Sequence, residues 1–315
     1  MDWRVKGVVQ KVLSHVPFGV AGNDLLQRTI GARRKLADEF AAKVNCDWTV
    51  VLDYMTELGI SPAGLDYLEI GTGWYPTFPL CFALAGAKSC TTFDQTRHLD
   101  ARHALRLLDA LPTHLATIAK ASHRSLAEVR AEYQKLRQAR GIDELLRDAR
   151  IDYRAPGDGA NTGLPDKSVD IVYSNSVLEH IPTDVIRRIM RESMRVLRPG
   201  GVAIHGVNCG DHYAYFDRSI TPINYLSYSE RHWAVWNNGI QYQNRLRPQD
   251  ILEIAENAGL EIILKRHEAK PQLLEKLEKM TIAPEFRKYS NEQLACTSVD
   301  FVARKRREAN VAAAE

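Results

Sequence analysis

The sequence predicts an α/β protein with a mostly parallel sheet covered by helices on both faces. Short apolar runs alternate with longer amphipathic stretches between residues 67 and 303, which is typical of such a sheet. The first run, 67–70, leads directly into Gly71-Thr72-Gly73. Glycines in a tight turn tolerate positive φ and let a ligand come close to the backbone. In an open α/β sheet, nucleotide-like cofactors bind at turns of this kind, where a strand ends.

The remaining core elements follow in order along the chain. After Pro76 a helix is predicted up to Gly86, and residues 89–93 form the second strand. Further strands are predicted at 151–154, 169–174, 202–207, 260–264 and 297–303. A helix with apolar positions from Val185 to Leu197 stops at Pro199-Gly200-Gly201, and another spans 248–258 before Gly259.

Three helices are predicted before the first strand. Residues 3–16 carry an apolar stripe, which we expect to pack on the main domain, with a peripheral membrane contact as the alternative. The stripe consists of Val5, Val8, Val9, Val12, Leu13 and Val16. Asn23 or Asp24 is expected to cap the second helix, and Asp47 the third, which ends near Gly59. We therefore expect residues 1–60 to form an N-terminal helical extension or cap.

Composition excludes several classes of protein. The 315 residues are 45% hydrophobic and 26% charged, as in an ordinary globular protein, and the net charge of +3 does not favour a nucleic acid or membrane partner. The five cysteines are scattered, without zinc-ligand spacing, so we expect reduced thiols and a cytoplasmic location. No apolar run is long enough for a secretory signal or a transmembrane helix.

Two segments are longer than usual loops. Residues 97–150 are helix-rich and carry eleven Lys and Arg against seven Asp and Glu. Residues 209–247 are dense in Tyr, Trp and Phe. We expect one domain over 61–304 that contains both segments, as a helical insert and an aromatic substrate insert, followed by a flexible tail at 305–315.

The glycine turn does not match two common nucleotide motifs. A dinucleotide-binding loop would need glycine at position 76, where the chain has Pro76. A P-loop would need Gly-Lys-Ser/Thr after the turn, which is absent. NAD, FAD and nucleoside triphosphates are therefore disfavoured as ligands.

Four segments together resemble the class I S-adenosylmethionine-dependent methyltransferases, in their small-molecule, type 11-like branch. They are Glu69-x-Gly71-x-Gly73 with Asp94 ending the next strand, Leu178-Glu179-His180-Ile181-Pro182 after 164–172, Arg195-Val196-Leu197-Arg198-Pro199-Gly200-Gly201, and 258–262. Their order and spacing match the family over roughly residues 65–304. The resemblance implies a Rossmann-like sheet of seven strands whose last strand is antiparallel, and S-adenosylmethionine as cofactor.

The family pattern implies which residues hold that cofactor. Glu69 would accept from the ammonium group, and Asp94 from the two ribose hydroxyls, a geometry that suits a carboxylate. Residues 158–161 would lie beside the adenine, and Asn175 beneath the methionine part. The residues so assigned are Glu69, Gly71, Thr72, Gly73, Trp74, Asp94, Gln95, Asp158, Gly159, Ala160, Asn175 and His180.

The aromatic insert is where we expect the methyl acceptor to bind. Its aromatic rings would supply contact area, and its polar groups would orient the acceptor. The alternative is that the rings form a small core of their own. The predicted substrate residues are Tyr213, Tyr215, Phe216, Trp233, Trp236, Tyr242, Asn244 and Arg245. His212, His232 and Asp211 are the candidate general bases for a hydroxyl acceptor. The same three residues match no named metal pattern, so we expect no metal.

The predicted function is in-line methyl transfer to a small molecule such as a polar metabolite, a sugar or a natural product. Positioning and exclusion of water are expected to account for most of the rate. One alternative is an RNA methyltransferase, although Ser174-Asn175-Ser176-Val177 lacks the Asn/Asp-Pro-Pro-aromatic motif of the exocyclic-amine branch. Another is a non-catalytic module that only binds the cofactor. The sequence leaves the acceptor and the oligomeric state open.

Overall fold

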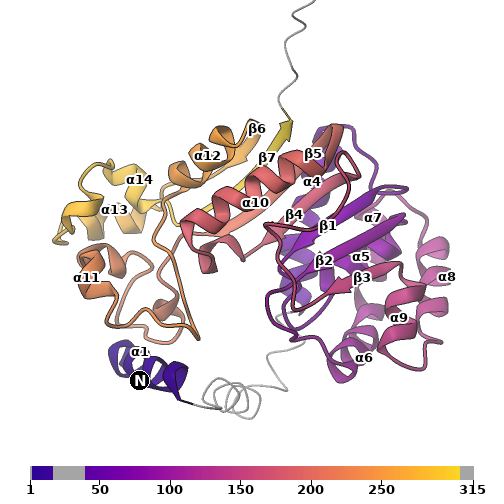
Figure 1. The fold of residues 1–315 in the computed structure, drawn as a ribbon, viewed down its shortest axis with the longest axis horizontal. Helices are drawn as coiled ribbons and strands as arrows, with labels where there is room; N and C mark the ends of the chain where they lie inside the picture. The colour runs from indigo at the N-terminus through magenta and orange to yellow at the C-terminus, as the bar shows by residue number, and fades with distance from the viewer. Residues whose placement is uncertain (1, 17–39, 306–315) are drawn as a thin grey trace, which may run out of the picture.

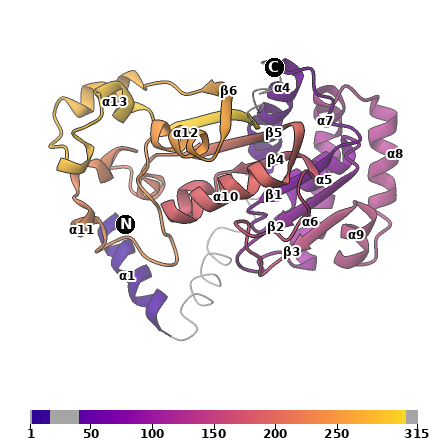
Figure 2. The same cartoon turned by 45° about the horizontal axis from the view of Figure 1, so that its top comes forward.

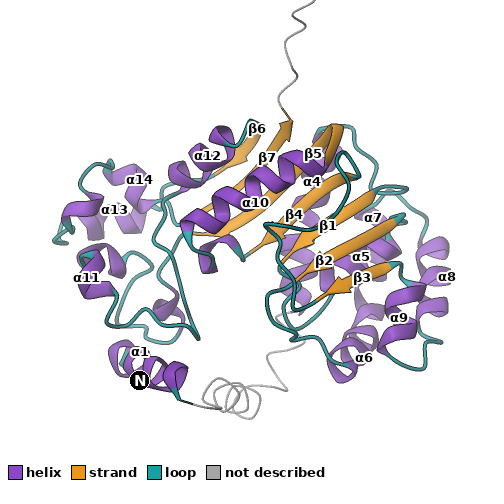
Figure 3. Cartoon of the chain, in the orientation of Figure 1, coloured by secondary structure: helices purple, strands orange, loops and turns teal. Residues whose placement is uncertain are grey.

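The described residues form one seven-stranded sheet, as predicted. The computed structural model describes residues 2–16 and 40–305. The strand order is β3-β2-β1-β4-β5-β7-β6, and β7 runs antiparallel to both of its neighbours while the other strand pairs are parallel (Figure 1, Figure 3). The strands are β1 (Asp66–Ile70), β2 (Ser89–Phe93), β3 (Ile151–Arg154), β4 (Val169–Asn175), β5 (Leu197–Asn208), β6 (Leu260–Arg266) and β7 (Ser298–Lys305).

Helices cover both faces of this sheet (Figure 1, Figure 2). On one face lie a π-helical turn η1 (Lys43–Trp48), α4 (Thr49–Glu57) and α5 (Thr77–Leu84), and on the other α10 (Thr183–Val196) and α12 (Pro248–Asn257). Side chains alternate along a strand. Tyr67 of β1 therefore packs in the hydrophobic core under α4 and α5, and Leu68 packs in the core under α10 and α12. β1 is buried throughout, so its carboxyl end is held rigidly.

The helical insert packs on the sheet beside β3, at the right of Figure 1. Leu107, Ile118 and Val129 from three of its helices are buried in the same core as α4 and α5. Several of its basic residues pair with acids, including Arg150 with Glu132 at 3.4 Å. The insert contains α6 (Ala101–Ala110), η2 (Leu111–His114), α7 (Leu115–Ala121), α8 (Leu126–Leu136) and α9 (Ile142–Asp148).

A second group of short elements gathers at the opposite end of the sheet (Figure 1). Its hydrophobic cluster includes Trp3 of α1 (Trp3–His15), Tyr213, Tyr225 and Trp233. We call this cluster the satellite core. Its elements are η4 (His212–Tyr215), η5 (Asn224–Ser227), α11 (Glu230–Trp233), α13 (Pro271–Leu277), η6 (Pro284–Phe286) and α14 (Asn291–Ala295). The sequence did not predict α13, η6 or α14.

The orientation predicted for the first helix is wrong. α1 forms as expected, but it packs through Trp3, Gly7 and Gln10. The valine stripe faces away from the domain, with Val12 59% exposed. Gly7 allows this contact because a Cβ there would lie 2.9 Å from the hydroxyl of Tyr213. Aromatic packing at the first turn therefore decides which face of α1 is buried.

Two further boundaries differ from the sequence prediction. Asp47 caps no helix, because the helical backbone already runs through η1 before α4 begins. Leu197 belongs to β5 and pairs with Val169, so the strand begins before Pro199-Gly200-Gly201. The pairing between β4 and β5 is irregular at these three residues. The helix expected after Asn23 or Asp24, and most of the tail predicted at 305–315, lie outside the described residues.

Within the part of the chain that the structure describes, none of the helices has the length and apolar character needed to span a lipid bilayer.

Candidate functional site

The glycine turn closes tightly against the neighbouring strands. Gly71 and Gly73 adopt φ of +87° and +67°, as the sequence predicts. The N–H of Gly71 donates to the carbonyl of Phe93 at 2.8 Å, and a Cβ on Gly71 would lie 2.4 Å from a methyl group of Val177. A Cβ on Gly73 would meet no atom within 4 Å. The turn is thus packed on one side and open on the side where a ligand would lie.

Asp94 holds this turn from the end of β2. One carboxylate oxygen accepts the N–H of Gly73 at 2.7 Å, and the other accepts the N–H of Thr96 at 3.1 Å. A carboxylate oxygen can accept two hydrogen bonds, so each oxygen retains an acceptor site. Asp94 is only partly buried, so these sites remain available to a diol.

Glu69 lies beneath the turn in a closed environment. Its side chain is 6% exposed and accepts a hydrogen bond from the hydroxyl of Thr92 at 2.5 Å. Thr92 in turn lies in hydrogen-bond contact with Thr72. Burial raises the pKa of Glu69 to about 7, which the hydrogen bond from Thr92 and the charge of Lys43 only partly oppose. The carboxyl group is therefore poised between its two protonation states near neutral pH.

The loop after β3 meets the same edge. The N–H of Gly157 donates to the carbonyl of Asp94 at 2.8 Å. Asp158 accepts the N–H of Ala160 at 2.8 Å, and a Cβ on Gly159 would lie 3.0 Å from Ile70. The predicted residues 158–160 thus lie beside the end of β1. The structure therefore brings the ends of β1, β2 and β3 together.

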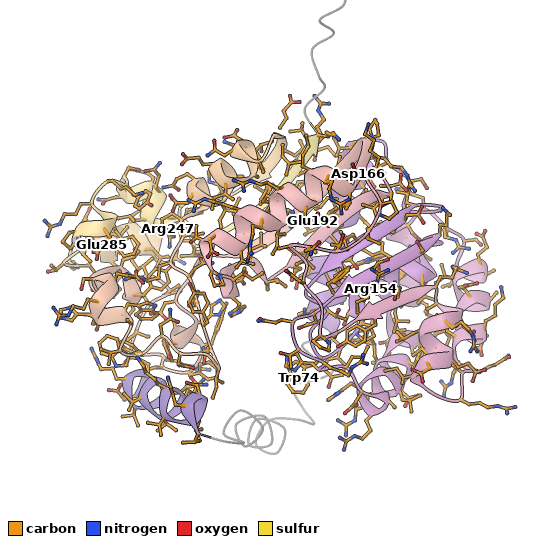
Figure 4. All side chains as sticks on the ribbon, in the orientation of Figure 1. Trp74, Arg154, Asp166, Glu192, Arg247 and Glu285 are labelled. Atoms are coloured by element: carbon orange, nitrogen blue, oxygen red, sulfur yellow. The ribbon has the colours of Figure 1, made fainter. Side chains whose placement is uncertain are left out.

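Two other predicted cofactor residues flank this edge. The ring of Trp74 lies 4.7 Å from that of His98 and 5.6 Å from that of His103, and Figure 4 places Trp74 at the margin of the sheet domain. Gln95 is exposed just after β2. Both lie beyond the tight turn and could contact a ligand only at its outer surface.

A cavity opens where β4 and β5 end. Ser176 turns the chain there with φ of +54°, which is uncommon for a residue with a side chain, and its N–H donates to Gly206 at 2.9 Å. Next to this turn the structure encloses a cavity of about 340 Å³. Its lining includes Asp47, Asn175, Ser176, Asn208, Asp211, Tyr215, Lys270 and Asp300.

This cavity is polar and contains two neighbouring carboxylates that sequence reasoning missed. Asp47 comes from η1 and Asp300 from β7, so no local motif joins them. Burial raises the pKa of both, and the charge of Asp47 raises that of Asp300 further. Lys270 also lines the cavity. The sequence offers no signal that would bring these two acids together.

The predicted catalytic residues do not converge on one point. Asp211 is buried and accepts hydrogen bonds from the backbone of Tyr213 and the amide of Asn224, both at 2.9 Å. Burial nevertheless raises the pKa of Asp211 to about 6. His212 is 9% exposed, and burial lowers its pKa to about 4, so its imidazole is neutral at physiological pH. His232 lies exposed on α11.

Most of the predicted substrate aromatics belong to the satellite core. Tyr213 and Trp233 are buried, and Trp236 packs against Trp3 at 4.8 Å between ring centroids. Tyr215, which is 68% exposed, lines the cavity. Phe216 lies exposed beneath the ammonium group of Lys6.

The predicted polar substrate residues connect segments of the chain. Asn244 donates from its amide to the carbonyls of Leu178 and Ile181 at 2.7 and 2.8 Å. The carbonyl of Tyr242 accepts from His180 at 2.8 Å. Arg245 is buried and pairs with Glu230 at 2.5 Å. These contacts fix the turn after β4 against the aromatic insert.

A family model described as "Methyltransferase domain" (type 11) matches residues 120–205, which run from the helical insert through β3 and β4 into β5. A comparison with curated proteins gives no match. Three solved structures illustrate the similarity in fold. The magnesium protoporphyrin IX methyltransferase of Synechocystis PCC 6803 is 14% identical, with 91% of this chain and 95% of that chain covered and a TM-score of 0.48.

The other two structures show similar values. A geranyl diphosphate methyltransferase is 13% identical, with 90% and 95% of the two chains covered and a TM-score of 0.47. A TehB-like methyltransferase from Corynebacterium glutamicum ATCC 13032 Kitasato is 15% identical, with 91% and 98% covered and a TM-score of 0.43.

The sheet order, with β7 antiparallel between β5 and β6, is that of the Rossmann-like methyltransferase fold, and the methyltransferase-domain model matches its central part. This match supports the predicted resemblance and enzyme class, and S-adenosylmethionine is the cofactor that the resemblance implies. Within the class, the matching model is the type 11 domain.

Proposed function

We propose that this methyltransferase acts on a small polar molecule bound in the cavity at the ends of β4 and β5. The cavity carries this proposal, because Asn175 and Ser176 line it and Val177, the next residue, packs directly on Gly71 of the cofactor turn. A volume of about 340 Å³ suits a small ligand. The acceptor and the turn would thus be adjacent.

The residues at the strand ends fit S-adenosylmethionine, which supplies a methyl group activated on a positively charged sulfur. The open side of Gly73 leaves room for the ligand. Asp94 would accept the two ribose hydroxyls through its remaining acceptor sites. Glu69 would receive the ammonium group, directly or through water, and Asp158 and Gly159 would lie beside the adenine. Asn175 would lie beneath the methionine part.

The chain's own contribution is positioning and exclusion of water. Ser176 and Asn208 offer polar groups to orient an acceptor, and Tyr215 covers the cavity from the aromatic insert. For a hydroxyl acceptor, we propose His212 as the base, because its neutral imidazole has an Nε2 without a hydrogen-bond partner. His232 is too exposed to be shielded from water there.

The lining charges favour a polar acceptor. Asp47 and Asp300 are both partly buried, and the charge of Asp47 raises the pKa of Asp300. A cationic or hydroxyl-rich ligand would offset this mutual repulsion. Lys270 at the same cavity can bind an acidic group. An apolar acceptor would leave these charges desolvated at considerable cost.

Calorimetric titration with S-adenosylmethionine tests the cofactor site. Asp94→Ala should weaken binding at least tenfold, about 1.5 kcal/mol or more, because hydrogen bonds to a charged group are lost. Asp109→Ala, which removes an exposed carboxylate on α6, is the matched control and should bind as tightly as wild type. Equal affinity of Asp94→Ala and wild type would contradict the assignment.

A turnover assay then separates an enzyme for small molecules from the alternatives. Wild type should transfer labelled methyl groups to compounds in a metabolite extract. Cofactor binding without any transfer would favour a non-catalytic module. Transfer to RNA, with binding that falls steeply as salt rises, would favour an RNA methyltransferase. The pairing of the insert's basic residues, such as Arg150 with Glu132, argues against RNA.

Two further proposals concern location. The exposed valines of α1 support a peripheral contact with a membrane surface, which co-sedimentation with anionic vesicles would test against a Val8→Ser, Val12→Ser variant. We also propose a cytoplasmic location, because the cysteines are free thiols. Cell fractionation would test it.

A further inference from the structure

Three metal-ligating side chains lie together beside the cavity. Glu179 and His180 belong to η3 (Leu178–His180), directly after β4, and His212 opens η4. One ligand atom from each lies within 4.8 Å of the others. Within residues 2–16 and 40–305, no other set of three such residues meets this criterion. The trio considered from sequence, in which Asp211 and His232 accompany His212, is therefore not assembled.

The side-chain oxygens of Glu179 and Nε2 of His212 are buried without hydrogen-bond partners. Glu179 is 1% exposed, and neither carboxylate oxygen has a hydrogen-bond partner of normal geometry. Burial raises the pKa of Glu179 to about 8, and the nearby N–H groups of Glu179 and Asn208 only partly oppose this. Nε2 of His212 likewise has no partner. Buried polar atoms are nearly always paired, so a converging set of unpaired ones points to a missing ligand.

The rings of His180 and His212 are set for coordination. Their centroids are 4.9 Å apart. Nδ1 of His180 lies 2.8 Å from the carbonyl of Tyr242, to which it can donate, leaving Nε2 free. Metal-bound histidines usually donate their second ring nitrogen to a carbonyl or carboxylate in this way.

The backbone around Glu179 is also fixed. Asn244 donates its backbone N–H to the carbonyl of Glu179 at 2.8 Å, and its side-chain amide holds the carbonyls of Leu178 and Ile181. This clamp spans η3 and prevents the turn from rotating the carboxylate away. The cluster is therefore built from two segments that are tied together.

We propose that Glu179, His180 and His212 bind a divalent transition-metal ion. Two imidazoles with one carboxylate form a ligand set used by zinc and by iron or manganese, and imidazole disfavours magnesium and calcium. At metal–ligand distances of about 2.1 Å, two ligand atoms of a tetrahedral ion lie about 3.4 Å apart. Atoms separated by up to 4.8 Å must therefore close by about 1.4 Å, which rotation of the exposed His180 can supply.

Such an ion would keep at least one coordination position open, because the cluster supplies three protein ligands. The ring of His212 lies 5.4 Å from that of Tyr215, and both Tyr215 and Asn208 line the cavity. We infer that an oxygen of the acceptor occupies the open position. This second step, the binding of the acceptor to the metal ion, rests on the proposed function. If it holds, His212 acts as a metal ligand and not as the general base.

Metal titration of the chelator-treated full-length protein tests the site without any cofactor. Every protein in the titration, including the one called wild type, carries Cys46→Ser, because Cys46 is an exposed thiol able to bind metal. Wild type should bind one equivalent of Zn²⁺ or Co²⁺. Glu179→Gln, His180→Ala and His212→Ala should each weaken binding by more than about 100-fold, beyond the loss typical of outer-shell partners. His267→Ala, an exposed histidine after β6, is the matched control and should bind as wild type.

Circular dichroism confirms that each variant is folded, and the Co²⁺ absorption spectrum reports whether histidine or thiolate coordinates the ion. No stoichiometric binding by wild type, or His212→Ala binding as tightly as wild type, would overturn the proposal. Failure of S-adenosylmethionine to bind the same protein would overturn the proposed function and leave the metal site standing. Stoichiometric metal binding that no acceptor perturbs would remove only the second step.

Discussion

Replacing Glu69 with glutamine should make the protein more stable at alkaline pH. Burial raises the pKa of this carboxyl from 4.5 in the unfolded chain to about 7 in the fold. The fold therefore favours the neutral form. The stabilisation this gives is complete below pH 4.5 and is lost as the pH rises through 7. Glutamine is neutral at every pH and close in shape, so the variant avoids this loss.

The size of the effect follows from the two pKa values. Their difference of roughly 2.5 pH units corresponds to about 3 kcal/mol at about 1.36 kcal/mol per unit. About 2.5 kcal/mol of this falls between pH 5 and pH 9, because the unfolded carboxyl is already mostly ionised at pH 5. Glu69 is 6% exposed, so screening by solvent reduces the figure little.

Urea unfolding of both proteins at pH 5, 7 and 9, without cofactor, measures this difference directly. Other titrating groups contribute equally to wild type and variant and therefore cancel. Between pH 5 and pH 9 the stability of Glu69→Gln relative to wild type should rise by about 2.5 kcal/mol. Parallel pH profiles for the two proteins would refute the reasoning, because they would mean that Glu69 is already ionised inside the fold.

Three further predictions concern the cofactor edge and the junction with the satellite core. Glu69 is mostly protonated at pH 6, so cofactor binding at this pH should release close to one proton, whereas the Glu69→Gln variant should release almost none. The proton release is measured as the dependence of the calorimetric binding enthalpy on the ionisation enthalpy of the buffer. Gly71→Ala should destabilise the protein by about 1–3 kcal/mol in thermal unfolding, because its Cβ would lie 2.4 Å from Val177, and Val177→Ala should recover part of this. Arg247→Met should cost about 3–5 kcal/mol in urea unfolding, because three backbone carbonyls and a tyrosine hydroxyl lose a buried donor, and each unpaired group costs about 1–3 kcal/mol. The exposed Arg266→Met should change little.

The sheet could be predicted from sequence because each strand carries its own signal. β2 and β3 have the predicted bounds, since apolar and β-branched residues between turn residues fix both ends. Leu197 was assigned to a helix because apolar periodicity cannot distinguish the last turn of a helix from the first residue of a strand. Tertiary pairing with Val169 decides it. The same limit applies to α1, where Trp3 outweighs the valine stripe in selecting the buried face.

The glycine turn and the cavity differ in how far apart in the sequence their residues lie. Gly71, Gly73 and Asp94 act through backbone conformation and hydrogen bonds within their own turns, so their roles in holding the edge follow from short motifs. The cavity residues Asp47 and Asp300 come from opposite ends of the chain and meet only in the fold. The aromatic insert carries an ambiguous signal for a different reason. Rings such as Trp233 bury large apolar areas, and most of them were needed for the satellite core.

A comparison of two buried histidines shows why the cluster of Glu179, His180 and His212 is best understood as a site. His205 is fully buried, and its Nε2 also lacks a partner, but Nδ1 lies 2.8 Å from the hydroxyl of Ser174 and burial keeps the ring neutral. One unpaired nitrogen costs about 1–3 kcal/mol, which a large core can absorb. At the cluster, Glu179 and His212 carry unpaired buried atoms, and one ligand atom of each lies close to one of His180, whose ring is already oriented by a carbonyl. Their costs add at a single point, and one bound cation would offset them together.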